Sequence, residues 1–403
     1  MSYKRLGDYI QQVNVRNRDL EDLPLVGLSI TKEFIPSIAN TIGTDMSTYR
    51  IIERNQFAYG PVTSRNGDKI TIALFDAYDK ALISQAYIPF KVKETNELNP
   101  EYLMMWFRRQ EFDRYARFKS HGSAREIFDW EEMCEVELPV PPIGKQREIV
   151  AQYQAVTNKI KVNEQICSTL EATAQALYKH WFVDFEFPNE EGKPYKSSGG
   201  AMLYNEELEK EIPEGWVGVK VKDFCDEMKN GATPSRDNLD YWNSQDIPWL
   251  KTGEISNNVV FSAEEYISEL GFKNSSTKLV PKDSVLMAMY GATAGQLAYL
   301  KSELTTNQAC CAMTCSDKNK SSFLYYVLLN QQNFIVTLAN GGAQANLSKQ
   351  IIEDLNLVLP KKLTSFGFEK FSDFIELKAI ITLENQKLTA AQSLLLSRLA
   401  REE

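Results

Sequence analysis

The 403-residue sequence predicts an α+β protein built from two domains of similar fold, each followed by a long helix. The Leu138-Pro139 pair recurs as Leu359-Pro360 at an offset of 221 residues, and the same offset relates Gln165 to Gln386. Each half mixes short alternating apolar runs with turn signals. Each half then ends in a stretch whose apolar positions recur every three or four residues. A repeat of this length indicates two similar domains and excludes a solenoid of short units.

The composition restricts the class of protein. With 43% hydrophobic residues the chain can bury two ordinary cores, and the prior of ~100 to 200 residues per domain agrees with two domains. No run approaches the roughly 20 apolar residues of a membrane span, and the start lacks the apolar region of a signal peptide. We therefore expect a soluble, cytoplasmic protein that does not contact a membrane. The net charge of −9 argues against nonspecific coating of nucleic acid, because such binding needs a basic surface.

Changes of pattern along the chain give the expected boundaries. Alternating runs and turns give way to a continuous helical pattern, then to a polar stretch rich in Gly and Ser, and the order then repeats. The prediction is a first domain at 1–143, a central helix at 144–185, a linker at 186–202, a second domain at 203–361 and a C-terminal helix at 362–403.

Both long helices have an apolar seam with steps of three and four residues, which is typical of helices that pack on other helices. The first seam would extend ~50 Å at 1.5 Å per residue, which is longer than a small domain can cover. We therefore expect the two helices to form an antiparallel coiled coil related by a pseudo-two-fold axis. The predicted seam residues are Ile149, Tyr153, Val156, Ile160, Asn163, Leu170 and Leu177, then Phe374, Leu377, Ile381, Glu384, Leu388 and Leu395.

Two seam positions are polar, and they coincide in the repeat. Asn163 and Glu384 are 221 residues apart. A polar seam residue lowers stability but fixes the register of a helix pair. This would suit a spacer that sets a distance, whereas exposure near the middle of the helix pair is the alternative explanation.

A series of motifs extends through the second half of the chain. In order, they are Pro213, Gly215-Trp216, Gly231–Ser235, Tyr241-Trp242, Ile247–Leu250, Gly253, Met289–Gly295, Asn307-Gln308 and Gly341–Lys349. Together they resemble the specificity subunits of type I restriction-modification systems. The first half matches less closely, mainly around Gln85, over Gly122–Ile127 and in the helix that follows. The resemblance covers nearly the whole chain.

The resemblance implies two target-recognition domains, each reading one half of a bipartite, asymmetric site on double-stranded DNA. It also implies that the helices set the spacer and dock two methyltransferase subunits, with restriction subunits where present. Members of the family have no catalytic centre, so no cofactor is expected. Two alternatives are a coiled-coil scaffold that reads no bases, and a DNA methyltransferase or nuclease in its own right.

The sequence offers little material for catalysis. Only His121 and His180 are available as histidine bases, and the six cysteines form no CxxC pair, so we expect neither a catalytic centre nor a metal site. Asn99-Pro100 resembles part of a methyltransferase motif, but it is better explained as a helix start. The glycine-rich Tyr290–Gly295 lacks the ending of a phosphate-binding loop and predicts a tight turn.

One basic cluster interrupts the acidic chain. Residues 108–125 contain six Lys or Arg and two Asp or Glu, with Tyr115 and Phe118 between them. A DNA-contacting surface and a solvated helix face explain this pattern equally well.

Base edges are read by Arg, Lys, Asn, Gln, Ser and Thr side chains presented on loops or helix ends. Arg65 and Arg236 could equally contact phosphates. Thr233 and Ser235 could serve only to cap the turn around Pro234. Gln344 and Asn346 could cap the following helix instead. The predicted DNA-binding residues are Ser64, Arg65, Asn66, Lys119, Ser123 and Arg125 in the first domain, and Thr233, Ser235, Arg236, Tyr290, Thr293, Gln344 and Asn346 in the second.

Overall fold

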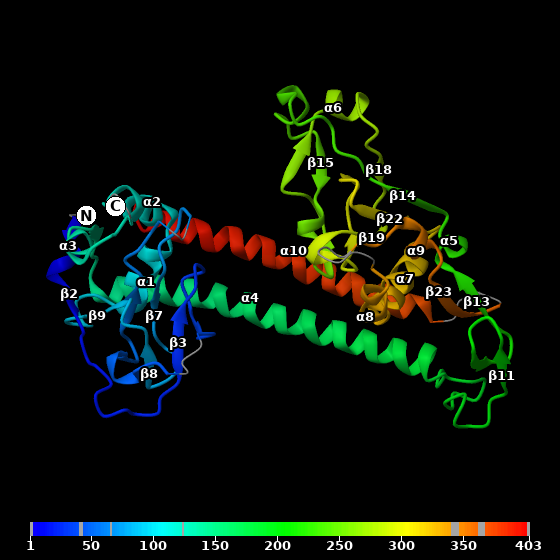
Figure 1. Cartoon of the computed structure of the whole chain (residues 1–403), viewed down its shortest axis with the longest axis horizontal. Helices are drawn as coiled ribbons and strands as arrows, with labels where there is room; N and C mark the ends of the chain where they lie inside the picture. The colour runs from blue at the N-terminus through cyan, green and yellow to red at the C-terminus, as the bar shows by residue number, and fades with distance from the viewer. Residues whose placement is uncertain are drawn as a thin grey trace. The chain divides into compact units, whose positions relative to one another are not determined.

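The computed structural model describes residues 3–39, 43–64, 67–122, 125–339, 346–361 and 367–400. The chain forms two compact units (Figure 1). One consists of Met1–Lys161 with Lys387–Glu403, and the other of Val162–Gln386. The division passes through both long helices, α4 (Ile143–Tyr178) and α10 (Phe368–Arg398). Each unit therefore contains one α+β domain and a part of each long helix, as the predicted fold class requires.

The described residues of the first unit form three sheets. One is the antiparallel sheet β2-β9-β6-β7, the second is β4-β3-β8-β5 with β3 and β8 parallel, and the third is the pair β1-β10. The strands are β1 Tyr3–Arg5, β2 Ile10–Gln12, β3 Leu25–Leu28, β4 Phe34–Pro36, β5 Arg50–Glu53, β6 Phe57–Tyr59, β7 Ile72–Leu74, β8 Lys80–Ile83, β9 Ile88–Val92 and β10 Glu137–Pro139. The helices are η1 Leu6–Asp8, η2 Met46–Thr48, α1 Pro100–Arg108, α2 Gln110–Phe118 and α3 Trp130–Cys134.

In the second unit the parts that the structure describes form four sheets: β14-β22-β19-β20-β16, β17-β15-β21-β18, and the pairs β13-β23 and β11-β12. The strands are β11 Met202–Asn205, β12 Lys210–Pro213, β13 Trp216–Lys220, β14 Glu227–Asn230, β15 Ile247–Leu250, β16 Asn258–Val260, β17 Glu265–Ile267, β18 Leu279–Val280, β19 Val285–Ala288, β20 Leu297–Leu300, β21 Leu304–Thr306, β22 Cys310–Thr314 and β23 Asn356–Pro360. The helices are η3 Lys179–Val183, α5 Val221–Phe224, η4 Leu239–Tyr241, η5 Thr252–Glu254, α6 Glu269–Lys273, η6 Gly291–Thr293, α7 Lys318–Asn330, α8 Gln332–Thr337 and α9 Lys349–Glu353.

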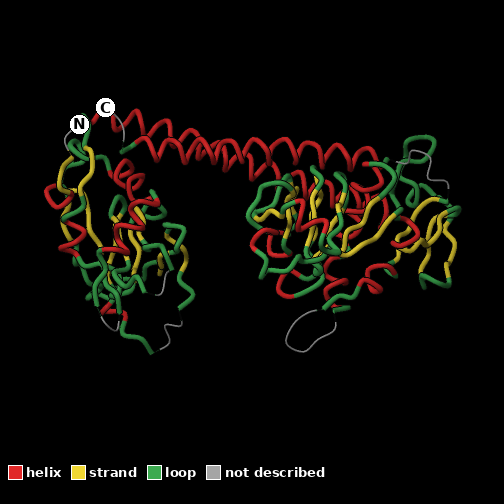
Figure 2. The backbone as a smooth tube through the Cα atoms, turned by 90° about the horizontal axis from the view of Figure 1, so that it is seen from above, coloured by secondary structure: helices red, strands yellow, loops and turns green. Residues whose placement is uncertain are grey.

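The two domains have the same strand order, which explains the sequence repeat. The order β2-β9-β6-β7 corresponds to β14-β22-β19-β20, and β4-β3-β8-β5 corresponds to β17-β15-β21-β18. The one parallel pair of the second sheet recurs as β3-β8 and β15-β21. Gln85 and Gln308, which the repeat relates, are each the second residue after the parallel strand of their domain. In both units the strands, yellow in Figure 2, have short helices beside them.

The register shows that not every tyrosine of the repeat corresponds. Phe57 pairs with Phe90 in β9, and Val285 pairs with Met313 in β22. Counting from these pairs makes Tyr290 equivalent to Val62 and not to Tyr59. Tyr59-Gly60 and Tyr290-Gly291 have the same two residues, but the register places them three positions apart in the repeat, and the two tyrosine side chains differ accordingly. Tyr59 is fully buried, while 41% of Tyr290 is exposed.

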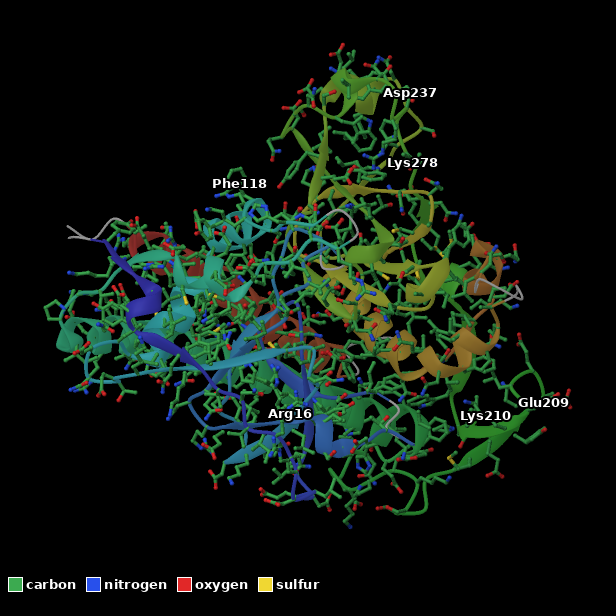
Figure 3. All side chains as sticks on the ribbon, turned by 60° about the vertical axis from the view of Figure 1, so that its left-hand side comes forward. Arg16, Phe118, Glu209, Lys210, Asp237 and Lys278 are labelled. Atoms are coloured by element: carbon green, nitrogen blue, oxygen red, sulfur yellow. The ribbon has the colours of Figure 1, made fainter. Side chains whose placement is uncertain are left out.

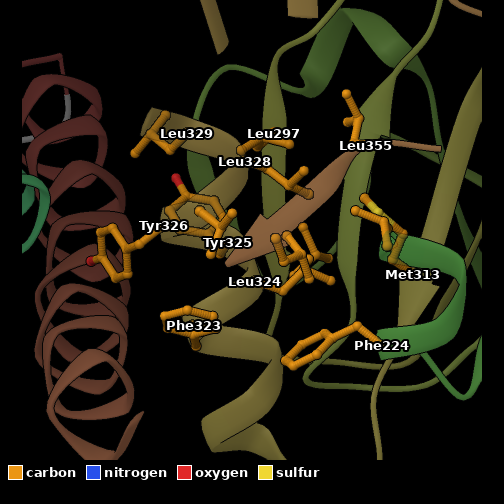
Figure 4. Close-up of a cluster of buried hydrophobic side chains, with 14 of the residues drawn as sticks. Phe224, Leu297, Met313, Phe323, Leu324, Tyr325, Tyr326, Leu328, Leu329 and Leu355 are labelled. Carbon is orange, nitrogen blue, oxygen red and sulfur yellow. The ribbon is translucent and has the colours of Figure 1, made fainter. Parts of the chain in front are cut away.

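Aromatic side chains fill both cores. In the first domain Phe57 stacks on Phe90 with 4.9 Å between ring centroids. In the second, Phe323 and Tyr326 of α7 lie beside Phe371 of α10, and Figure 4 shows Tyr326 pointing toward that helix. Such burial contributes roughly 1.5 to 3 kcal/mol per large apolar side chain. The long helices are thus part of the domain cores as well as connections between them.

The predicted helix start at Asn99-Pro100 is confirmed. The Asn99 carboxamide oxygen accepts hydrogen bonds from the amides of Glu101 and Tyr102, and Pro100 occupies the first helical position. Asp317 caps α7 in the same way at the corresponding place in the second domain. The motif is structural and not part of a methyltransferase site.

The predicted seams match the burial of the helices with one exception. Ile149, Tyr153 and Asn163 are buried, and the remaining seam residues other than Leu377 are half-buried. Leu377 is 49% exposed, so its assignment to the seam is wrong. Near this end α10 packs against the second domain as well as α4, and its buried face passes through Ile375 and Lys378.

The segment expected to be a linker is packed against the second domain. Phe187 stacks on both Tyr195 and Trp216, with ring centroids 4.6 and 4.9 Å apart. Pro188 and Pro194 form an isolated β-bridge, and the hairpin β11-β12 follows directly. The polar composition therefore marks a folded loop beside the second core.

Candidate nucleic-acid interface

Four of the predicted DNA-binding residues, Arg65, Asn66, Ser123 and Gln344, lie outside the described residues. The other nine are Ser64, Lys119, Arg125, Thr233, Ser235, Arg236, Tyr290, Thr293 and Asn346. All of them lie on loops, turns or helix ends. Their placement comes from the strands that precede them.

In the first domain the two predicted segments lie side by side. The loop after β6 pairs with the segment before α3 through a bridge between Val62 and Ile127 and a bond from the Thr63 amide to the Glu126 carbonyl. The Thr63 hydroxyl also donates to the hydroxyl of Ser120 at 2.9 Å. Ser64 directly follows the paired part of the first segment. Lys119 and Arg125 flank the second, so the fold gathers these predicted residues at one edge.

The second domain repeats this arrangement. Tyr290 forms a β-bridge with Asn346, and the Leu347 amide donates to the Met289 carbonyl. The 3-10 turn Gly291–Thr293 confirms the tight turn predicted there. Ser348 caps helix α9, so Asn346 is not the capping residue.

The Gly231–Ser235 motif packs against the end of β21. The Thr233 hydroxyl donates to the Gln308 carboxamide oxygen at 2.5 Å. A Cβ on Gly231 would lie 2.1 Å from the carbonyl oxygen of Thr306, so only glycine fits there. Since Met289 hydrogen bonds to Ala309, this turn lies at the same edge as Tyr290. Gln308 is a polar residue at this edge that sequence reasoning did not include, although its match with Gln85 was a usable signal.

Arg236 is held in place by two tryptophans and a carboxylate. Its guanidinium lies 3.5 Å from the ring centroid of Trp242 and 4.7 Å from that of Trp249, and it pairs with Glu265 at 2.6 Å. Hydrogen bonds, from Lys251 first and then from Arg236, hold the pKa of Glu265 below its ordinary value. The tryptophan N–H groups donate to the carbonyls of Ser235 and Ala232. The turn is therefore rigid, and the charge of Arg236 is partly neutralised.

Acidic neighbours pair with much of the basic cluster at 108–125. Arg117 pairs with Glu126 at 2.7 Å, and Lys119 pairs with Glu132 at 3.2 Å. Both acids follow the cluster in sequence, so a local count of charges could not include them. Phe118, between the two cations at the end of α2, is 81% exposed (Figure 3). The cluster is less basic than its sequence indicates.

The polar seam residues contact each other directly. The Asn163 side-chain amide donates to the Glu384 carboxylate at 2.7 Å and to the Asn385 carbonyl oxygen at 2.8 Å. Asn163 is only 1% exposed, so the alternative of an exposed position is wrong for this residue.

Two further polar contacts join α4 to α10, one in each unit. In the second unit Lys378 pairs with Glu171 at 2.5 Å, and in the first Gln392 donates to Thr157 at 2.8 Å. Thr157 and Lys378 are related by the 221-residue offset, and so are Glu171 and Gln392. Within the second unit Asn163 meets Glu384 and Glu171 meets Lys378, so the residue numbers fall along α10 as they rise along α4, and the two helices run antiparallel there.

The described residues contain no cluster of three or more His, Cys, Asp or Glu side chains that could hold a metal ion. Burial raises the pKa of the Cys311 thiol to about 12. None of the helices in the described ranges has both the length and the apolar character to cross a membrane.

Comparison with known proteins identifies the two domains. The family model for the type I restriction modification DNA specificity domain matches residues 32–172 and 213–390. The chain belongs to this family. Membership confirms the expected role as the DNA-specificity subunit of a type I restriction-modification complex, in which recognition is bipartite and the chain is not one of the enzymes. The alternatives of a pure scaffold and of a methyltransferase or nuclease are therefore rejected.

Individual relatives agree with the assignment. The specificity subunit of the type I restriction enzyme HindI from Haemophilus influenzae is 24% identical, over 88% of this chain and 87% of the relative. The specificity subunit of MjaIX from Methanocaldococcus jannaschii is 27% identical, over 71% of this chain and 64% of the relative. The crystal structure of a type I S subunit from M. genitalium has the same fold, with a TM-score of 0.56, 11% identity and coverage of 100% of this chain and 96% of that one.

Proposed function

We propose that each target-recognition domain of this specificity subunit reads its half-site with the loop edge described above. In the first domain this edge carries Ser64, Lys119 and Arg125, and in the second Thr233, Gln308, Tyr290 and Asn346. The observation that carries the proposal is that, in each domain, loops far apart in sequence are hydrogen bonded at one edge. Because the two edges carry different side chains, the two half-sites should differ. We propose that the protein acts in the cytoplasm, where it binds double-stranded DNA.

We also propose that α4 and α10 form an antiparallel coiled coil that sets the unread spacer between the half-sites. The buried Asn163–Glu384 contact supports this, because a polar pair inside a helix seam is satisfied in one register only. The matched contacts Thr157–Gln392 and Glu171–Lys378 support the same register. A helix pair with a fixed register can act as a ruler.

Removing one heptad from each helix tests the ruler. Segments 164–170 and 385–391 are related by the repeat, and their deletion removes seven residues from each helix between the flanking contacts Thr157–Gln392 and Glu171–Lys378. These two contacts keep a common register, whereas Asn163 loses Asn385 and no longer faces Glu384. Loss of seven residues shortens the helix pair by ~10 Å, which is about 3 bp of DNA, so the recognised spacer should shrink by that amount. The measurement is a map of methylated adenines in cells that express the variant with its methyltransferase.

The control is a deletion of 164–170 alone, which breaks the register and should abolish site-specific methylation. Unchanged half-sites with an unchanged spacer in the double deletion would contradict the ruler.

We further propose that the helices dock two methyltransferase subunits through exposed apolar side chains placed alike in the repeat. Val162 is 48% exposed and Leu383 is 39% exposed, and the two are 221 residues apart. Exposed Gln165 and Gln386 lie three residues further along their helices. A repeated surface suits two copies of one partner.

Each of the single variants Val162→Asp and Leu383→Asp should bind one methyltransferase subunit instead of two. The double variant should bind none. Native mass spectrometry of the purified complex measures this number. Leu394→Asp is the matched control. Leu394 is 60% exposed, but the equivalent position of α4 in the repeat is the polar Thr173, so this apolar position is not repeated. Two bound subunits in the double variant would contradict the docking surface.

A further inference from the structure

A second group of cations in the first domain lies on the segment that follows β2. Arg16, labelled in Figure 3, and Arg18 are both exposed. Arg16 faces Arg50 of β5 across an isolated β-bridge. Backbone bonds from the Asn17 amide to the Tyr49 carbonyl and from the Ile51 amide to the Val15 carbonyl fix this pairing. The fold therefore holds two arginines, 34 positions apart in sequence, directly opposite each other.

No carboxylate of the described part of the chain balances these arginines. Among the described residues, none of the acids lies within ion-pair distance of Arg16, Arg18 or Arg50, although Asp19 and Glu21 follow closely in sequence. The Nε of Arg50 is buried and has no hydrogen-bond partner. Burial, and then the charge of Arg16, lower the pKa of Arg50. Like charges held this close are unfavourable unless an anion lies between or beside them.

Two other exposed arginines of the same domain are paired. Arg54 pairs with Asp79 at 3.2 Å, and Arg5 pairs with Glu135. In the second domain Arg236 is likewise paired. Arg16 and Arg18 share the lack of an acidic partner with exposed Arg125, but only they lie on the segment that pairs with a further arginine, Arg50.

The group also lies next to the turn that carries Gln85. Arg50 donates through Nη1 to the Tyr87 carbonyl, in the turn between β8 and β9. The corresponding turn of the second domain carries Gln308, which contacts the Gly231–Ser235 motif. The segments after β2 and β14 occupy equivalent places in the two sheets.

We infer that Arg16 and Arg18, with Arg50 behind them, form a phosphate-binding site that anchors the DNA backbone beside the first half-site. This inference rests on the proposed function. The arginine fork matches phosphate oxygens in geometry, and such contacts position a protein on DNA without reading bases. In the second domain Arg236 could bind a phosphate in this way only by breaking its ion pair with Glu265.

The test compares complexes assembled from the full chain and its methyltransferase, bound to a duplex that contains the mapped site and to one that lacks it. In Arg16→Ala/Arg18→Ala, the slope of log K against log salt should fall by about 2, since each phosphate contact contributes ~0.9. Binding to both duplexes should weaken, by about 10-fold or more at low salt. Arg16→Lys/Arg18→Lys keeps both charges and should keep the slope.

The matched control is Arg5→Ala/Arg54→Ala, which removes two exposed but paired arginines from the same domain and should leave the slope unchanged. Equal melting temperatures establish that the variants are folded. An unchanged slope in the Arg16/Arg18 variant overturns the inference, and so does weaker binding to the mapped site alone, which would indicate base reading. If the wild-type complex itself lacks site-selective methylation, the proposed function fails instead.

Discussion

The two recognition domains have the same sheets but different edges. Both place a parallel pair inside one sheet and share four antiparallel strands in the other, to which the second domain adds β16 parallel to β20. In the second domain the edge is fixed by tryptophan N–H bonds and by the paired Arg236. In the first, the equivalent segment carries Arg16 and Arg18 without acidic partners.

This comparison shows that the buried residues are needed for the fold, whereas the residues at the edge can differ between the two domains. Buried residues such as Leu6 and Val221, both fully inaccessible, begin the corresponding first turns of the two domains and keep the same role. The edge residues bury little apolar surface, so their replacement costs little stability. A duplicated specificity subunit can therefore keep its architecture while the two halves come to read different DNA.

The largest expected effect is on the rigid edge of the second domain. Gly231→Ala would place a Cβ 2.1 Å from a backbone oxygen, which neither segment can avoid without moving. We expect a loss of about 3 kcal/mol in the free energy of unfolding and loss of site-specific DNA binding. Urea denaturation and duplex binding measure the two effects.

Gly27→Ala in the first domain is the control, since its new Cβ would meet nothing nearer than the Tyr87 hydroxyl at 3.8 Å. Its stability should change by no more than about 1 kcal/mol. Equal losses in the two variants would show that the second edge is no more tightly packed than the first.

A smaller difference is expected between the stabilities that the Lys378–Glu171 and Gln392–Thr157 contacts contribute, one in each unit. Lys378→Met leaves Glu171 as an unpaired charge, with side-chain exposures of 11% and 18% in the native pair, and should cost about 3 kcal/mol. Gln392→Leu removes the repeat-related contact with Thr157, which joins neutral groups, and should cost about 1 kcal/mol.

Hydrogen exchange and urea denaturation of the full chain check this order. Glu171→Gln combined with Lys378→Met removes both charges and should recover part of the stability. If Gln392→Leu is as harmful as Lys378→Met, then the second unit does not depend more on charge than the first.

The repeat, the helix seams and the polar pair were predictable because they depend on periodic positions that any single chain displays. Asn163 and Glu384 were found in this way, and they bond to each other. The misassigned Leu377 marks the limit of the method, since a heptad pattern contains no information about a third surface that packs on the same helix. The net charge of the basic cluster was overestimated for a similar reason, because the partners Glu126 and Glu132 lie beyond the window in which charges were counted.

By itself, the sequence determined that there are two α+β domains, that each precedes a long helix, and that the family is one of DNA specificity subunits. These features follow from periodicity and from motifs in a fixed order, which are properties of the chain. Only the tertiary structure decided which cations are neutralised and which loops share an edge. Arg16 meets Arg50, and Thr233 meets Gln308, through strand pairing between segments far apart in sequence. Such contacts depend on sheet register, which no local pattern of residues specifies.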